Sequence, residues 1–247
     1  MRLGIAAAAL LAACAPAAAT PASAPGPTLV EWQAARAALA RLNAVAATPR
    51  TVRLALTLRE PRTGRVLSAR GAVAVLPPSA LRMILLGPGG TTALDLWIQG
   101  DHWRFAVPAI DLRKRGELWA PREERQGLPV DFLAFWLLRP ASGRLLWHAR
   151  DPDGDRFVLR DGAAIVDLRA LDDGRLEARR ATWSDPSTDG APAHLLDEET
   201  VSASGPGCAE VRYHQASTGL DVTVLCEGET TGAPPARALA DPDAEAP

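Results

Sequence analysis

The chain has 247 residues, 47% of them hydrophobic, and its 27 Lys and Arg against 29 Asp and Glu give a formal net charge of −2. Binding to nucleic acid needs a basic surface that neutralises phosphates, so this balance argues against a nucleic-acid partner. Between compositionally biased ends, the remaining length suits one folded domain, which we expect over residues 28–230.

Residues 1–13 have the layout of a signal peptide, because Arg2 is followed by a run of Ala and Leu that ends before Cys14. The run is shorter than the roughly 20 apolar residues of a transmembrane helix. Leu11-Ala12-Ala13-Cys14 looks like a bacterial lipobox. That resemblance implies cleavage before Cys14, lipid on its sulfur and anchoring in the cell envelope. Because Ala15 is not aspartate, it favours the outer membrane, facing the periplasm. The alternative is an ordinary signal peptide cleaved nearby.

Two segments have compositions that do not support a packed core. Residues 15–27 are almost all Ala, Pro, Ser, Thr and Gly, so we predict that residues 14–27 are the lipidated cysteine and a flexible tether. Residues 231–247 are rich in Ala, Pro and Asp, and we predict that they form a disordered tail.

A helix is expected to open the folded domain. Thr28-Leu29-Val30-Glu31 has the spacing of a capping box, and the Ala-rich stretch that follows extends to about Ala46. Its apolar side chains fall on one stripe, as in an amphipathic helix. The stripe needs an apolar surface to cover and consists of Trp32, Ala35, Leu39 and Leu42.

From Val52 onward apolar residues recur at every second position, which predicts strands. Turns near Pro61, Pro77, Gly87 and Gly100 divide them, and each turn length fixes a register. The four registers agree on one continuous apolar face of a five-stranded antiparallel sheet, since a slip by one residue would reverse every side chain. The expected pairs include Leu54–Gly71, Leu58–Leu67, Val73–Met83, Val75–Leu81, Met83–Leu94, Leu81–Leu96, Leu96–Phe105 and Ile98–Trp103. The other face carries polar side chains such as Arg53, Arg82, Asp95 and Arg104, with Ile84, Leu86 and Trp97 as exceptions.

The rest of the chain adds a short apolar helix over residues 127–138 and more strands. These strands are expected near 145–149, 156–160, 163–170, 176–183 and 195–202, followed by a hairpin at residues 211–224. Asp161-Gly162 and Asp173-Gly174 are typical hairpin turns. With about eleven strands, two helices and no βαβ alternation, we predict a mainly β, α+β fold with a curled antiparallel sheet.

Cys208 and Cys226 flank the final hairpin, and an oxidising periplasm permits a disulfide between them. The register that pairs Tyr213 with Val222 and Val211 with Val224 places Cys226 opposite Ala209 instead. Free thiols therefore stay an alternative.

Two segments resemble the LolB-like outer-membrane lipoproteins, which share the LolA/LolB lipoprotein-carrier fold. They are residues 81–96, a strand, a Gly-Pro-Gly-Gly turn and a strand, and residues 127–138, a Pro-containing helix. The resemblance implies an unclosed barrel, lidded by helices, whose apolar cavity accepts acyl chains of lipoproteins. Gly89 stands where LolB has a bulky Leu, a departure that bears on lipoprotein insertion into the membrane. The cavity would be formed by Leu54, Leu56, Val73, Met83, Leu94, Leu96, Trp103 and Phe105, and the lid by Phe132, Phe135 and Trp136.

No motif predicts an enzyme, a metal site or a cofactor. Asp151-Pro152-Asp153-Gly154-Asp155 opens like a calcium loop, but its twelfth position is Gly162, so we predict a turn. Acidic pairs such as Glu198-Glu199 are interpreted as solvated. We predict a lipid-anchored protein that binds a lipid or lipoprotein acyl chain, with unknown envelope proteins as further partners. The alternatives are an interaction module with a filled core and a hydrolase that would need convergent polar residues at a cavity mouth.

Overall fold

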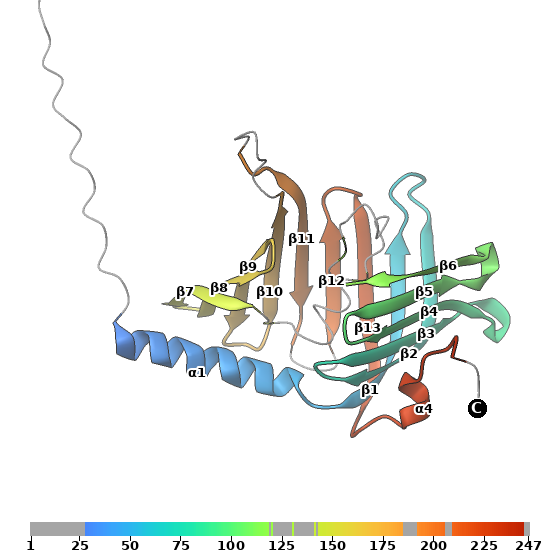
Figure 1. Ribbon diagram of the computed structural model, residues 1–247, viewed down its shortest axis with the longest axis horizontal. Helices are drawn as coiled ribbons and strands as arrows, with labels where there is room; N and C mark the ends of the chain where they lie inside the picture. Colours follow the sequence, from blue (N-terminus) through green and yellow to red (C-terminus); the bar gives the residue numbers. More distant parts are fainter. Residues whose placement is uncertain are drawn as a thin grey trace, which may run out of the picture.

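The computed structural model describes residues 28–118, 120, 130, 141, 143–184, 192–205 and 209–244. One antiparallel sheet of thirteen strands has the order β6-β5-β4-β3-β2-β1-β13-β12-β11-β10-β9-β8-β7, so that β6 and β7 are free edges. The sheet curls without closing, with β7–β9 at one side and β3–β6 at the other (Figure 1). The predicted fold class and N-terminal helix are confirmed, whereas the predicted number of strands is too low.

The elements follow one another in chain order as a meander. They are α1 (Leu29–Ala46), β1 (Arg50–Arg59), β2 (Val66–Leu76), β3 (Ala80–Leu86), β4 (Thr92–Gln99), β5 (His102–Val107), β6 (Leu112–Glu117), β7 (Arg144–Asp151), β8 (Gly154–Asp161), β9 (Ala164–Leu171), β10 (Leu176–Trp183), β11 (Leu195–Ala203), β12 (Glu210–Gln215), β13 (Leu220–Thr231) and α4 (Ala236–Leu239).

Helix α1 begins at the predicted capping box. The amide of Thr28 donates to Glu31 Oε2 at 2.7 Å, and the amide of Glu31 donates to Thr28 Oγ1 at 3.3 Å. The backbone hydrogen bond from Thr28 holds the pKa of Glu31 below its ordinary value. The predicted stripe packs on the core: Ala35 is buried, and Trp32, Leu39 and Leu42 are partly buried against it.

Three of the four predicted turns set the expected registers, including Leu54–Gly71, Val75–Leu81 and Ile98–Trp103. The fourth prediction is wrong by two residues, because Met83 pairs with Leu96 and Leu81 with Ile98. Residues 87–91 form the connection, and a bulge between Leu85 and Leu86 adds to the offset. A shift of two residues keeps each side chain on its original face, so the predicted apolar face survives the error.

Strand β6 is absent from the predictions because its sequence, Leu-Arg-Lys-Arg-Gly-Glu, contains a single apolar residue. Its place is set by Trp103 of β5, whose indole nitrogen donates to the carbonyl of Glu117 at 3.1 Å. Gly116 lies against the indole, and a Cβ atom there would come within 2.9 Å of the Trp103 ring. The strand is thus specified by packing and not by its own pattern.

The prediction of a disordered tail from residue 231 is wrong for the part of the tail that the structure describes. Strand β13 reaches Thr231, and residues 232–244, which we name the C-terminal strap, form α4 and cross the outer side of the sheet. Leu239 is buried with Ala74 and Ala80. The strap also covers Trp97 and Arg104, both only 6% exposed, which the sequence placed on a solvated face.

Candidate functional site: a concave apolar face

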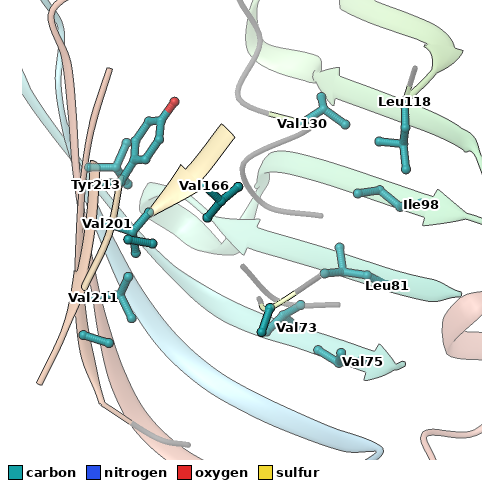
Figure 2. Packing of buried hydrophobic residues seen from close by; sticks show 14 of the residues in the cluster. Val73, Val75, Leu81, Ile98, Leu118, Val130, Val166, Val201, Val211 and Tyr213 are labelled. Carbon is teal, nitrogen blue, oxygen red and sulfur yellow. The ribbon is translucent and has the colours of Figure 1, made fainter. Parts of the chain in front are cut away.

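Inward-facing side chains of neighbouring strands line up in rows across the concave side of the curled sheet. Figure 2 shows Val73, Leu81 and Ile98 on one wall, with Val201, Val211 and Tyr213 on the wall opposite. Alternation along each strand and the observed registers together place these side chains on one face. The longest row crosses eight strands through Phe157, Leu168, Ala178, Val201, Tyr213, Val222, Leu58 and Leu67.

The structure brings all eight predicted cavity residues into this one apolar cluster. Six of them are buried, namely Leu54, Val73, Met83, Leu96, Trp103 and Phe105. Leu56 and Leu94 are partly buried. The predicted lid residues Phe132, Phe135 and Trp136 lie outside the described residues. Val130, just before them in the chain, is helical and fully buried in the same cluster.

The concave face divides into two halves that differ in exposure. The covered half lies near the turns at residues 77–79 and 100–101, and its side chains Val73, Val75, Leu81, Leu96 and Ile98 are all 0% exposed. The open half lies near the turns at residues 60–65, 87–91 and 108–111, and its apolar side chains are only partly covered. Leu67 is 52% exposed there. The open half consists of Leu56, Leu58, Leu67, Ala69, Leu94, Val107, Leu112 and Leu220.

A buried polar cluster, defined as Arg180, Asp197, Glu199, Tyr213 and Gln215, shares the concave face. Glu199 Oε2 accepts from Arg180 Nη1 at 2.9 Å, and its Oε1 accepts from the Tyr213 hydroxyl at 2.9 Å. Asp197 Oδ2 accepts from Gln215 Nε2 at 2.7 Å. Buried charges of this kind persist only when they are paired and hydrogen-bonded. The cluster therefore gives the otherwise apolar face one fixed polar region.

The sequence interpretation missed this cluster and is wrong for Glu199, which was expected to be solvated but is only 4% exposed. Strand alternation was the signal that could have found it. On β11 the side chains of Asp197 and Glu199 lie on the same face of the strand as the buried Val201 and Ala203. Glu198 faces outward and forms an ion pair with Arg179.

Other predicted motifs prove to be structural. The Asp-rich stretch is the β7–β8 turn, in which Asp151 pairs with Gly154 and the Asp155 carboxylate contacts His148 Nε2 at 3.0 Å. This confirms the turn interpretation. In the part of the chain that the structure describes, no three His, Cys, Asp or Glu side chains are close enough together to hold a metal ion.

The final hairpin has the predicted register, with Val211 opposite Val224 and Tyr213 opposite Val222. Cys226 takes part in a disulfide bond. Cys14 and Cys208 lie outside the described residues, so the pairing of Cys208 with Cys226 and the lipidation of Cys14 stay predictions.

Two grooves lie on the convex side, and charged side chains line part of each. One, of about 740 Å³, crosses β9–β13, and its lining includes outward-facing charged side chains such as Asp167, Arg179 and Arg212. Several of these pair across strands, as Arg169 does with Glu177 and His214 with Asp221. The other, of about 760 Å³, lies over β1–β3 and includes Arg53, Arg70 and Glu227. The concave face is thus the candidate site for an apolar ligand.

None of the helices in the described residues combines the length and the apolar character needed to cross a bilayer.

Comparison with known proteins supports the fold assignment. No protein-family model and no curated sequence matches the chain. Among solved structures, a LolA-superfamily protein from Nitrosomonas europaea superposes with a TM-score of 0.53 at 14% identity, over 84% of this chain and 97% of the other. A protein of the DUF1329 family from Desulfovibrio piger gives a TM-score of 0.49 at 12% identity, over 81% and 92% of the two chains. A domain from Vibrio parahaemolyticus described as a putative outer membrane lipoprotein-sorting protein gives a TM-score of 0.41 at 9% identity, over 80% of this chain and 93% of the other. The chain has a LolA/LolB-like fold.

Proposed function

We propose that this protein is a non-enzymatic envelope lipoprotein that binds an acyl chain of a lipid or of another lipoprotein on its concave face. The observation that carries the proposal is the open half of that face, where apolar side chains from several strands are left partly exposed beside a fully covered half. Large exposed apolar surfaces on soluble domains typically mark binding sites. The likeness in fold to a LolA-superfamily protein agrees with the carrier fold that the sequence resemblance implies.

To compete with a bilayer for an acyl chain, the protein must shield the chain from water and not only offer an apolar surface. Each CH₂ group transferred from water contributes about 0.8 kcal/mol, but a bilayer offers the same gain. A protein therefore competes for the chain only where its walls exclude water from both sides. The open half offers one such wall, and we propose that the acyl chain lies against it, beside the fully covered half.

The membrane anchor and the mode of binding complete the proposal. Lipid on Cys14 and the tether at residues 14–27 would hold the protein at the outer membrane, with the half-barrel in the periplasm. In the β3–β4 connection, Gly89 and Gly90 both have positive φ values and present no apolar side chain to the bilayer. We therefore propose reversible binding of the acyl chain without loop-driven insertion.

The test compares two substitutions of equal size on opposite faces of neighbouring strands. Ala69 on β2 faces the open half, whereas Ala55 on β1 faces outward. In a Cys14→Ser full-length chain, Ala69→Trp should weaken the binding of cis-parinaric acid, a fluorescent fatty acid, by about tenfold or more, because the indole removes several CH₂ contacts. Ala55→Trp should leave binding unchanged. Palmitate should displace the probe from the unsubstituted chain.

The second candidate is an interaction module with a filled core, and the complete burial of the covered half favours it. In that case the Cys14→Ser chain binds neither cis-parinaric acid nor palmitate. Ala69→Trp then only lowers the free energy of unfolding, by about 1–3 kcal/mol through overpacking. Equal loss of probe binding in both Trp variants would also contradict the proposed site.

A further inference from the structure

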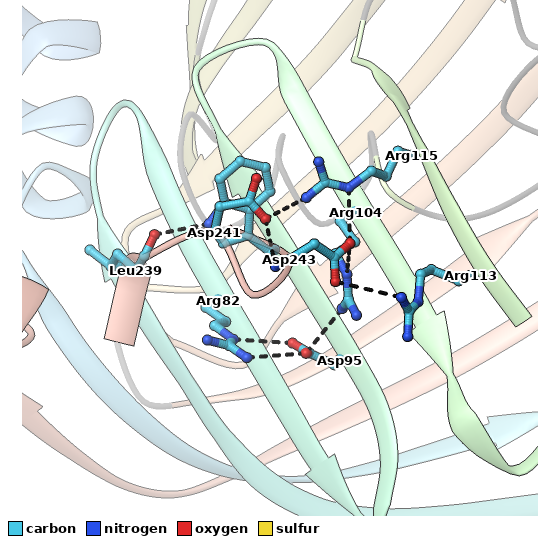
Figure 3. Close-up of polar contacts among 9 residues, drawn as sticks. Arg82, Asp95, Arg104, Arg113, Arg115, Leu239, Asp241 and Asp243 are labelled. Atoms are coloured by element: carbon cyan, nitrogen blue, oxygen red, sulfur yellow. Dashed lines mark hydrogen bonds and ion pairs between the residues drawn. The ribbon is translucent and has the colours of Figure 1, made fainter. Parts of the chain in front are cut away.

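The outer face of β3–β6 carries a concentration of positive charge around one indole. Arg82, Arg104, Arg113 and Arg115 come from three strands of this face (Figure 3). Arg82 and Arg104 lie directly opposite Trp97 of β4 on the neighbouring strands. Asp95 is the carboxylate that the sheet itself supplies to this group, and it bonds both Arg82 and Arg104, each at 3.1 Å. Asp95 thus pairs with two of the four guanidinium groups.

The C-terminal strap supplies the missing negative charge. Asp243 Oδ2 accepts from Arg104 Nε at 2.9 Å and lies 3.2 Å from Arg115 Nε, and Asp241 forms an ion pair with Arg115. The side chain of Arg104 is left only 7% exposed. The hydrogen bond from Arg104 holds the pKa of Asp243 below its ordinary value, and hydrogen bonds from the Asp243 amide and from Arg115 do the same for Asp241.

Apolar and backbone contacts also hold the strap against the sheet. Leu239 packs against Ala74 and Ala80, and the indole nitrogen of Trp97 donates to the Leu239 carbonyl at 2.9 Å. Arg115 also lies over the Trp97 ring, 5.8 Å from its centroid. The sheet therefore contacts the residues of a short pattern, Leu-x-Asp-x-Asp, over residues 239–243.

The strap is attached in a way that permits exchange. In the described part of the chain, no backbone–backbone hydrogen bond joins residues 236–244 to the sheet. Each polar contact is made by a side chain of the sheet, and the groups it meets, two carboxylates and a carbonyl, occur in any acidic extended peptide. The ion pairs of Arg113 and Arg115, whose side chains are 66% and 45% exposed, are weak individually and are screened by salt. The buried Arg104 needs a carboxylate partner, so a ligand that supplies its own carboxylates can displace the strap.

We propose that this outer face is a recognition site for an acidic protein segment of the Leu-x-Asp-x-Asp type. The strap is its resident ligand, held in cis, and the acidic segment of an envelope partner takes its place. This inference is independent of acyl-chain binding, because the site lies on the opposite face of the sheet.

The probe is a synthetic peptide with the sequence of residues 236–247, added to the full-length chain. Asp241→Asn/Asp243→Asn weakens the resident strap while leaving the four arginines intact. This variant should bind the peptide at least about tenfold more tightly than the unsubstituted chain, whose tethered strap competes at a high effective concentration. A peptide with Asn at both Asp positions should bind at least about tenfold more weakly, and added salt should weaken binding of the acidic peptide.

The matched control is Asp172→Asn/Asp173→Asn, which removes two exposed, ion-paired carboxylates from the distant β9–β10 turn. It should bind the peptide no better than the unsubstituted chain. Circular dichroism reports folding, and Asp241→Asn alone serves if the double variant is unfolded. The proposal is overturned if the folded variant does not bind the peptide, if the Asn peptide binds equally well, or if the unsubstituted chain binds as tightly as the variant.

Discussion

At the scale of single residues, the buried polar cluster sets this face apart from an ordinary apolar core. Arg180 and Glu199 lie with side chains 12% and 5% exposed, where removal of one partner leaves a buried charge uncompensated. Tyr213 combines the two characters of the face: its ring joins the apolar row, while its hydroxyl donates to Glu199. The cluster therefore fixes β10, β11 and β12 relative to one another.

Tyr213→Phe tests this role without changing the packed ring. Loss of a hydrogen bond to a charged carboxylate should lower the free energy of unfolding by about 1.5–3 kcal/mol, measured by urea denaturation. Thr57→Ala removes a hydroxyl that contacts Ser68 Oγ at 3.3 Å on the exposed face, and it should change stability by less than about 0.5 kcal/mol. Equal effects of the two substitutions would show that the buried hydroxyl has no special role.

At the scale of elements, the strap and the edge strand β6 stabilise each other. Strand β6 pairs with β5 alone, and its outward Arg113 and Arg115 face Asp243 and Asp241 of the strap. An unprotected edge strand invites pairing with other chains. The strap thus stabilises β6 through ion pairs on its outer face, where the strand has few apolar side chains.

Acid should release the strap. The pKa values of Asp241 and Asp243 are below the ordinary 3.8, so their stabilising effect is complete above that value and is lost as the pH falls through the lowered pKa values. The groups that face them are Arg104, Arg113 and Arg115, with Arg82 and Asp95 behind. The strap should therefore remain attached at neutral pH and detach only as the pH falls below the ordinary carboxyl value of 3.8.

The indole N–H signals in NMR spectra provide the measurement. Trp97 donates to the strap, whereas Trp103 donates to Glu117 inside the sheet and serves as an internal control. Hydrogen exchange at Trp97 should accelerate at low pH before exchange at Trp103 does. Simultaneous loss of both protections would mean that acid unfolds the sheet as a whole and not the strap.

Local pattern and turn length predicted most elements because each strand here carries its own alternation. The lengths of the Pro77 and Gly100 turns predicted the correct registers. Beside the β3–β4 connection, a bulge shifts the strand pairing without changing the apolar pattern, so the sequence does not reveal it. Strand β6 and the strap could not be predicted in the same way. Their positions depend on Trp103, Trp97 and four arginines supplied by residues far away in the chain, which a local pattern does not record.

At the scale of the whole molecule, the unclosed sheet creates an asymmetric interior. A closed small barrel fills its interior with side chains, whereas this sheet ends at β6 and β7 and leaves part of its concave face to be covered by other groups. Helix α1 covers some of it through Trp32, Ala35 and Leu39. The open half, around Leu56 and Ala69, is the surface that an acyl chain would complete.

The most direct test of acyl-chain binding is to locate a bound chain by cross-linking. The Cys14→Ser full-length chain would be illuminated with a photoactivatable palmitate analogue and the labelled residues identified by mass spectrometry. Binding in the half-barrel predicts labels at Leu56, Ala69 and Leu94 that excess palmitate suppresses. Labels confined to convex positions such as Ala55 and Ala72, or no label that palmitate suppresses, would contradict the account.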